Sequence, residues 1–313
     1  MRNTYRFLKK SLAIILICLL AVVIFGVICF AFMYDADRYA LRFPHVVTIM
    51  LYLFVVGTIA YSIFVCVKAK SINVTHIKKN NKLLQFASML TAIMMLIFFI
   101  YECVVSITRA NFQLYFFFRV TRWLLSLPAC LYFAFQAIPK KIHRTKIVVP
   151  TWAKVTMSIC SIAWCVFGIL TTYFSSLPTT DIAKITQLIV YASLALFLVF
   201  EGEFQNAKQR HKPYMISAFI CTTLTFAFPL GISVAKIIGK MSPYRAFSQP
   251  ELLLSVAIGV YALAKMSALV STMHTVIESS NTGGHSSKFD KKPATIKADV
   301  VEGAGKSDEN TDK

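Results

Sequence analysis

A single lysine stands inside an apolar run near the C-terminal end of the chain. The run reads VYALAKMSALV over residues 260–270, and the stretch 252–273 holds no charge besides Lys265. That stretch is long enough to cross a bilayer, where an ammonium group is costly. About 12 Å of helix separates Lys265 from Met273, too far for easy snorkelling. The position therefore favours a functional amine, and a desolvated lysine can form a Schiff base with an aldehyde.

The composition is that of a membrane protein. The 313 residues are 57% hydrophobic, and the mean hydropathy is +0.64. Residues 1–273 hold 27 Lys/Arg and seven acids, so the net charge of +19 belongs to the apolar part of the chain. Basic loops at an anionic lipid surface explain this charge better than nucleic-acid binding. All eight cysteines lie in apolar stretches without metal-ligand spacing, so neither a disulfide framework nor a metal site is expected.

Apolar runs predict an all-α, polytopic membrane protein with eight crossings. The predicted helices span about 11–33, 46–67, 83–108, 112–138, 152–174, 185–207, 214–236 and 251–274. Lys and Arg are more numerous before the first helix and in every second break. This alternation predicts a multi-pass protein with both termini in the cytoplasm, in the plasma membrane or an internal membrane.

The first apolar run is expected to be a retained membrane anchor, because it is longer than the apolar region of a usual signal peptide. Three parts are therefore predicted: an N-terminal segment with an extra helix (1–40), a seven-helix domain (41–275) and a disordered cytoplasmic tail (276–313). The sequon at Asn73 is expected to face the cytoplasm without a glycan. The polar tail leaves no room for a folded enzyme domain.

The segment FFFRVTRWLLSLPACLYF (116–133), together with ALAK in the last helix, resembles the microbial (type I) rhodopsins. The third-helix motif of that family is matched by Arg119, Trp123, Leu124, Leu125 and Pro128, and the retinal lysine of the seventh helix by Lys265. The resemblance covers about residues 46–275. The extra first helix is similar to that of the eight-helix enzyme rhodopsins.

The resemblance implies a seven-helix, rhodopsin-like bundle with all-trans retinal bound covalently to Lys265. It implies a pocket of further residues around the chromophore: Arg122, Trp123, Ser126, Leu127, Cys130, Thr225, Phe228, Pro229, Ile232 and Tyr261. For Ser126 and Cys130, packing of small residues between helices is an equally good interpretation.

The departures from the family motif concern its carboxylates. Arg122 and Tyr261 replace the two acids near the Schiff base, and Phe133 replaces the internal proton donor. Outward proton pumping is therefore not expected. An arginine about 4–5 Å from the Schiff base would favour a neutral base that absorbs in the near-ultraviolet. Glu102 could act as counterion or pair with Arg119 or Arg122; alternatively, it is a helix-end acid in water.

The leading function predicted from these residues is a retinal-binding photoreceptor for sensory transduction rather than an enzyme or a pump. One alternative is a light-gated anion channel, because Arg119 and Arg122 would make a basic constriction. Another is a non-photoactive, opsin-like or transporter-like membrane protein whose lysine carries no retinal. Besides retinal and the lipid bilayer, another copy of the chain or a cytoplasmic signalling protein stays open as a partner.

Overall fold

The computed structural model describes twelve segments of the chain. They are residues 2–35, 40–41, 45–69, 81–108, 114–138, 141–142, 145–146, 150–175, 178, 181–205, 211–239 and 247–282. The sequon at Asn73 and the tail beyond residue 282 lie outside these segments, so the predictions made for them stay predictions.

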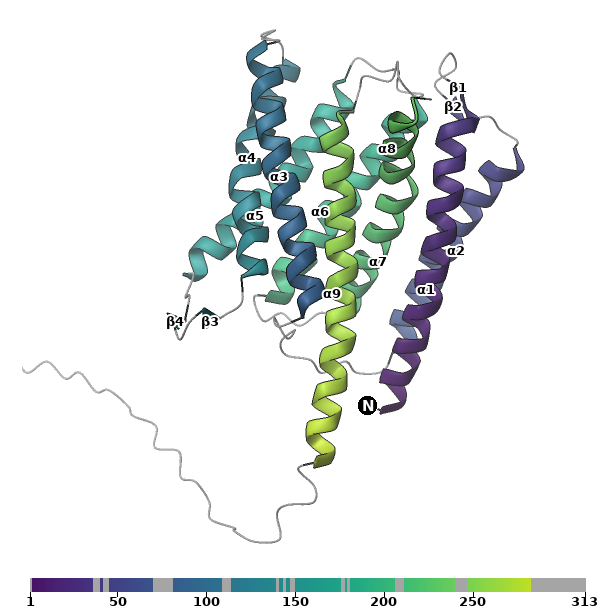
Figure 1. The fold of residues 1–313 in the computed structure, drawn as a ribbon, viewed down its shortest axis with the longest axis vertical. Coiled ribbons are helices and arrows are strands. Elements are labelled where there is room, and N and C mark those ends of the chain that lie inside the picture. Colours follow the sequence, from purple (N-terminus) through teal and green to yellow (C-terminus); the bar gives the residue numbers. More distant parts are fainter. Residues whose placement is uncertain are drawn as a thin grey trace, which may run out of the picture. The chain divides into compact units, whose positions relative to one another are not determined.

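The described residues are almost entirely helical (Figure 1). The helices are α1 (Arg2–Ile28), α2 (Val46–Lys68), α3 (Lys82–Thr108), α4 (Leu114–Ala137), α5 (Thr151–Tyr173), α6 (Ile182–Gln205), α7 (His211–Ala227), α8 (Pro229–Ile237) and α9 (Gln249–Thr282), and α1 continues as a π-helical segment, η1 (Cys29–Met33). Two antiparallel pairs of two-residue strands lie in the connections: β1 (Tyr34–Asp35) with β2 (Ala40–Leu41), and β3 (Lys141–Ile142) with β4 (Thr145–Lys146).

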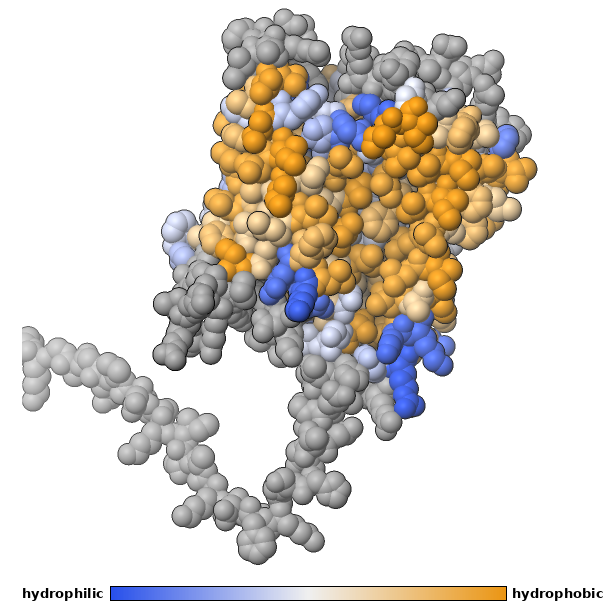
Figure 2. Space-filling model, in the orientation of Figure 1, coloured by the Kyte–Doolittle hydropathy of each residue, from blue (hydrophilic) through white to orange (hydrophobic). Residues whose placement is uncertain are grey.

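Seven of the described helical segments are long and apolar enough to cross a membrane: α1 with η1, α2, α3, α5, α6, α7 with α8, and α9. The predicted class, an all-α multi-pass membrane protein, is confirmed at this level. The helix α4 is 24 residues long but is not among the seven, and its two arginines lower its hydropathy. Figure 2 shows a broad hydrophobic band on one face of the molecule, with hydrophilic residues gathered toward its two ends.

Helix ends differ from the prediction at both termini. The first helix begins at Arg2 rather than near residue 11, and α9 continues to Thr282, beyond the predicted start of a disordered tail at 276. The prediction followed apolar runs, whereas an established helix adds polar residues at little cost once its first turns exist. Residues 276–282 are therefore helical, and the prediction that they are disordered is wrong.

A proline divides the crossing predicted at 214–236 into α7 and α8. Pro229 has no backbone N–H to donate, and its ring clashes with the preceding turn, so α7 ends at Ala227 and α8 begins at Pro229. Phe228 lies between them, and its N–H still bonds to the Leu224 carbonyl at 3.1 Å. The crossing is therefore interrupted but not unwound.

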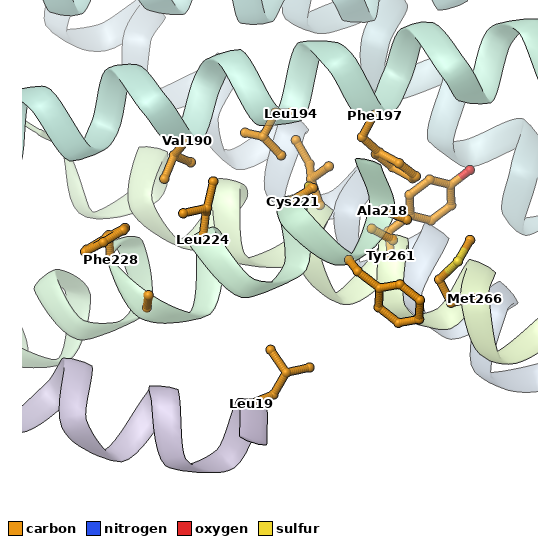
Figure 3. Packing of buried hydrophobic residues seen from close by; sticks show 14 of the residues in the cluster. Leu19, Val190, Leu194, Phe197, Ala218, Cys221, Leu224, Phe228, Tyr261 and Met266 are labelled. Carbon is orange, nitrogen blue, oxygen red and sulfur yellow. The ribbon is translucent and has the colours of Figure 1, made fainter. Parts of the chain in front are cut away.

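The helix α9 lies against several helices from different parts of the sequence. Thr91 of α3 donates to the Ala257 carbonyl at 3.0 Å, and Thr222 of α7 donates to the Gly259 carbonyl at 3.3 Å. Gly259 is required here, because a β-carbon at this position would lie 2.0 Å from the Thr225 hydroxyl oxygen. Figure 3 shows the neighbouring core, where Leu194 and Phe197 of α6 lie close to α7 and Tyr261 of α9.

The extra helix α1 packs against α2 and against the broken crossing α7–α8. At the break, a β-carbon on Gly26 would lie 2.4 Å from the Ala227 carbonyl oxygen, and one on Gly231 would lie 2.8 Å from the Gly26 carbonyl oxygen. Phe30 meets Phe228 edge to face, with ring centroids 6.3 Å apart. Small residues that allow close backbone approach are typical of helix contacts in membranes.

Replacing Gly26 by leucine should separate α1 from the break. We expect Gly26→Leu to lower the free energy of unfolding by about 1–3 kcal/mol, the usual cost of overpacking. Thermal unfolding in detergent measures this loss. Gly57→Leu on α2 is the matched control, because nothing lies within 4 Å of a β-carbon there. Equal stability of the two variants would contradict a close contact at Gly26.

Candidate functional site

Lys265 pairs with a buried glutamate of another helix. Its ammonium nitrogen Nζ lies 2.9 Å from Oε1 of Glu201, and α9 supplies the lysine while α6 supplies the glutamate. Both side chains are buried. The Tyr261 hydroxyl donates a hydrogen bond to the same Oε1 atom, and Nζ lies 5.2 Å from the centre of the Tyr261 ring. The three side chains form one electroneutral cluster.

The sequence explains why these groups meet. Tyr261 and Lys265 are four residues apart, so they lie on the same face of α9, which here faces α6. Aromatic side chains surround the cluster: the Tyr261 ring lies 5.1 Å from the Phe133 ring and 6.2 Å from the Phe197 ring, between centroids. This apolar shell keeps the local dielectric low, which strengthens the attraction between the two charges.

A second buried ion pair joins α4 to the first turn of α9. Arg122 donates from Nη1 to Glu251 Oε1 at 2.8 Å and to the Thr171 hydroxyl at 3.4 Å. Its Nη2 donates to the Tyr191 hydroxyl, which in turn donates to Glu251. Glu251 was not predicted to face Arg122, because nothing in the sequence aligns α4 with α9.

Three aromatic rings enclose the Arg122 guanidinium. Its Cζ atom lies 4.9 Å from the Phe98 ring centre, 4.6 Å from that of Trp164 and 4.8 Å from that of Tyr191. Such rings attract a guanidinium through their negative faces. We call Arg122 and these three rings the arginine cage. The Tyr191 ring can reach this position because Gly168 opposite it has no side chain; a β-carbon there would lie 3.0–3.2 Å from the ring.

Glu102 pairs with Arg119 rather than with Arg122. The Arg119 Nε atom lies 2.5 Å from Glu102 Oε2, and the Arg119 side chain is 20% exposed. The prediction that Glu102 pairs with an arginine therefore describes the structure, and the alternative of a lone helix-end acid in water does not.

The two fully buried pairs lie far apart along the bundle. Glu251 and Lys265 are 14 residues apart on one continuous helix, which corresponds to about 21 Å. Arg122 therefore does not lie within 4–5 Å of Lys265, and the expectation of a neutral Schiff base was built on a wrong distance. The charged group next to Lys265 is the carboxylate of Glu201.

The pocket residues implied on α4 do not gather around Lys265. Arg122 contacts Glu251 and Phe133 contacts Tyr261, so α4 runs parallel to α9. Residues 123–130 therefore lie between the height of Glu251 and the height of Tyr261 along the bundle. Trp123 stacks on Phe99 with centroids 5.4 Å apart, and Leu127 is 40% exposed. Ser126 bonds to the Trp123 carbonyl of its own helix, and Cys130 to the Ala92 carbonyl of α3.

The pocket residues implied on α7 and α8 also lie elsewhere. Thr225 packs on Gly259, Phe228 packs on Phe30 of η1, and Pro229 begins α8. Ile232 is buried on α8 beside Ser233, which bonds to Gln249 at the start of α9, 16 residues before Lys265. Of the implied pocket, Tyr261 is the residue that the structure places in contact with the lysine.

Sequence reasoning missed Glu201, the partner of Lys265. It sits four residues before the end of α6 and therefore resembles an acid at a water-facing helix end. The available signal was its position directly after the apolar run LIVYASLALFLVF.

Within the described segments, fold and site define a polytopic helical membrane protein with a buried lysine–glutamate pair and a buried arginine cage. No family model matches the chain, and neither a curated protein nor a solved structure matches it.

Proposed function

We propose that the chain is a transporter-like membrane protein in which Lys265 and Glu201 form a proton-exchange centre. The observation that carries this proposal is the 2.9 Å contact between two buried, oppositely charged groups on different helices. Ionisable groups inside membrane helices are rare because they are costly, and they commonly mark proton relays and solute pathways.

The pair couples protonation to helix contact. With both groups ionised the cluster is neutral, and α6 and α9 attract each other. A proton delivered to Glu201 removes its negative charge and leaves the ammonium of Lys265 without compensation. The uncompensated charge then favours water entry or separation of the two helices. Glu201 lies about 6 Å from the end of α6, so the route for a proton from that side is short.

Proton flux into liposomes that contain the purified protein tests this function. A pH-sensitive dye inside the vesicles should report faster proton entry than in empty vesicles when a pH gradient is imposed. We expect Glu201→Gln and Lys265→Met each to reduce the protein-dependent rate at least about tenfold, the effect of about 1.4 kcal/mol on a barrier. Lys154→Met is the matched control, because Lys154 is exposed on α5. Wild-type flux in both site variants, or none in the wild type, would refute the proposal.

A retinal-binding light sensor is the second candidate, and the Glu201 carboxylate is the observation that favours it. Retinal attached to Lys265 would have a counterion at hydrogen-bonding distance. A nearby carboxylate stabilises a protonated Schiff base, so this candidate now predicts absorption in the visible rather than the near-ultraviolet. Signals would pass to a cytoplasmic partner or another copy of the chain. The anion-channel alternative gains nothing, because Arg119 and Arg122 each contact a carboxylate.

Addition of all-trans retinal separates the two candidates. A light sensor should develop a visible band that hydroxylamine removes, and borohydride reduction should leave a retinyl group on the peptide that contains Lys265. The transporter-like protein should gain neither the band nor the adduct. Retinyl on another lysine would contradict the assignment of Lys265 as the retinal-binding residue.

The proposed topology places both termini in the cytoplasm, with α4 crossing the membrane in addition to the seven segments named above. Eight crossings put the termini on the same side of the membrane, whereas seven crossings would put them on opposite sides. Epitope tags at residues 1 and 313 should both resist external protease in intact cells. Cleavage of one tag alone would show that one of the eight segments does not cross.

A further inference from the structure

Buried polar atoms without a hydrogen-bond partner gather around the arginine cage. Among the residues that the structure describes, they include Nε of Arg122, Nε1 of Trp164, Oγ1 of Thr172 and both amide atoms of Gln187. All four residues are at most 5% exposed. Buried polar groups are almost always bonded to protein, water or a ligand, so a cluster of such exceptions calls for a polar occupant.

These groups come from three helices and converge on one guanidinium. The Trp164 ring centre lies 4.6 Å from Arg122 Cζ, and Thr172 lies on the same face of α5, one turn after Gly168, which faces the Tyr191 ring. Gln187 lies one turn before Tyr191 on α6, and its amide lies beside the Tyr191 hydroxyl without a hydrogen bond of good geometry. The unbonded atoms therefore border the arginine cage from α4, α5 and α6.

The chemistry of these atoms selects an acceptor. A guanidinium N–H and an indole N–H can only donate, while the threonine hydroxyl and the glutamine amide can also donate. An occupant that presents several acceptor oxygens would accept from all of these donors, while Oε1 of Gln187 is itself an acceptor and needs a donor such as water. A carboxylate offers two oxygens, and its planar shape suits a guanidinium.

The local charges select a single negative charge. Glu251 bonds to Arg122 and also lies within electrostatic range of Lys236 of α8. Two cations thus share one carboxylate, which leaves one positive charge uncompensated in this group. A monovalent anion would neutralise it, whereas a divalent phosphate would leave a buried negative charge.

We propose that Arg122, Trp164, Thr172 and Gln187 form a binding site for a small monocarboxylate. The bound carboxylate accepts hydrogen bonds from the guanidinium Nε, the indole N–H and the side chains of Thr172 and Gln187. Glu251 stays between Arg122 and Lys236 and balances the second cation. This site is about 21 Å from Lys265, so it exists whether or not the lysine pair exchanges protons.

Binding of acetate to the purified full-length protein tests the site. Sodium acetate should raise the unfolding temperature of the wild type in a saturable manner, at constant sodium concentration with chloride as the replaced anion. Trp164→Phe keeps the ring and removes one donor, and Gln187→Leu removes the amide at similar volume. Each should weaken acetate binding about tenfold, as expected for the loss of one charge-assisted hydrogen bond. Gln136→Leu on α4 is the control and should bind acetate like the wild type.

Three results would overturn the proposal. No saturable effect of acetate on the wild type would mean that the site does not bind a carboxylate. Equal stabilisation by chloride or inorganic phosphate would contradict selectivity for a monocarboxylate. Unchanged acetate binding in both Trp164→Phe and Gln187→Leu would place any acetate site elsewhere. The unfolding temperature of each variant without acetate shows whether it folds, and Gln187→Leu should not be less stable than the wild type, because it removes unbonded polar atoms.

Discussion

Glu201→Gln should lower the free energy of unfolding by about 3–5 kcal/mol, because it leaves the buried ammonium of Lys265 without its carboxylate. The contact that is lost measures 2.9 Å and lies between side chains that are almost inaccessible to solvent. Chemical or thermal unfolding in detergent gives the difference.

The double variant Lys265→Met/Glu201→Leu separates pairing from simple truncation. Removing both charges leaves an apolar contact, and replacement of a buried ion pair by apolar groups is often neutral or stabilising. We therefore expect the double variant to be more stable than either Lys265→Met or Glu201→Gln. A double variant that loses the sum of the two single losses would mean that the two charges do not depend on each other.

Arg122→Met should cost about 3–5 kcal/mol as well, because it leaves Glu251 buried without its cation and empties the arginine cage. Arg122→Lys should restore little of this loss. An ammonium group cannot reproduce the planar stacking between rings or the separate bonds to Glu251, Tyr191 and Thr171.

Arg119→Met is the matched control for the arginine prediction. Arg119 lies on the same helix and also contacts a glutamate, but its side chain is 20% exposed. Only the arginine of this pair is partly solvated, whereas Glu102 is as buried as Glu251, so we expect an intermediate loss of about 1–3 kcal/mol. Equal losses at Arg119 and Arg122 would contradict the importance assigned to burial and to the cage.

The positions of the helices followed from the sequence because length and apolarity determine which segments cross a membrane. Predicted and observed boundaries of the inner helices, such as 83–108 against Lys82–Thr108, agree within a few residues. The ends at Arg2 and Thr282 were missed because polar residues continue a helix without adding to an apolar run. Pro229 was named as a pocket residue, but the division of this crossing into α7 and α8 was not predicted.

The candidate site was predictable in part. Lys265 was identified by its cost in an apolar segment, which is a local property of the sequence. Its partner Glu201 is 64 residues away, and the contact depends on how α6 packs on α9. The same limit applies to Arg122. A motif gives the spacing of residues along α4, but it does not say which residues of α9 lie beside them, because packing determines that. In the structure Arg122 lies beside Glu251, about 21 Å along the helix from Lys265.

The charge state of Glu201 tests the central claim, that Lys265 and Glu201 form a buried ion pair, most directly. Infrared difference spectra of the wild type and Glu201→Gln isolate the band of this one carboxyl group. We expect an ionised carboxylate in the wild type, and we expect Lys265→Met to convert it to the protonated acid, because a lone buried carboxylate is too costly to keep. A protonated Glu201 in the wild type, or a carboxylate band unchanged by Lys265→Met, would contradict the ion pair and the proton-exchange centre built on it.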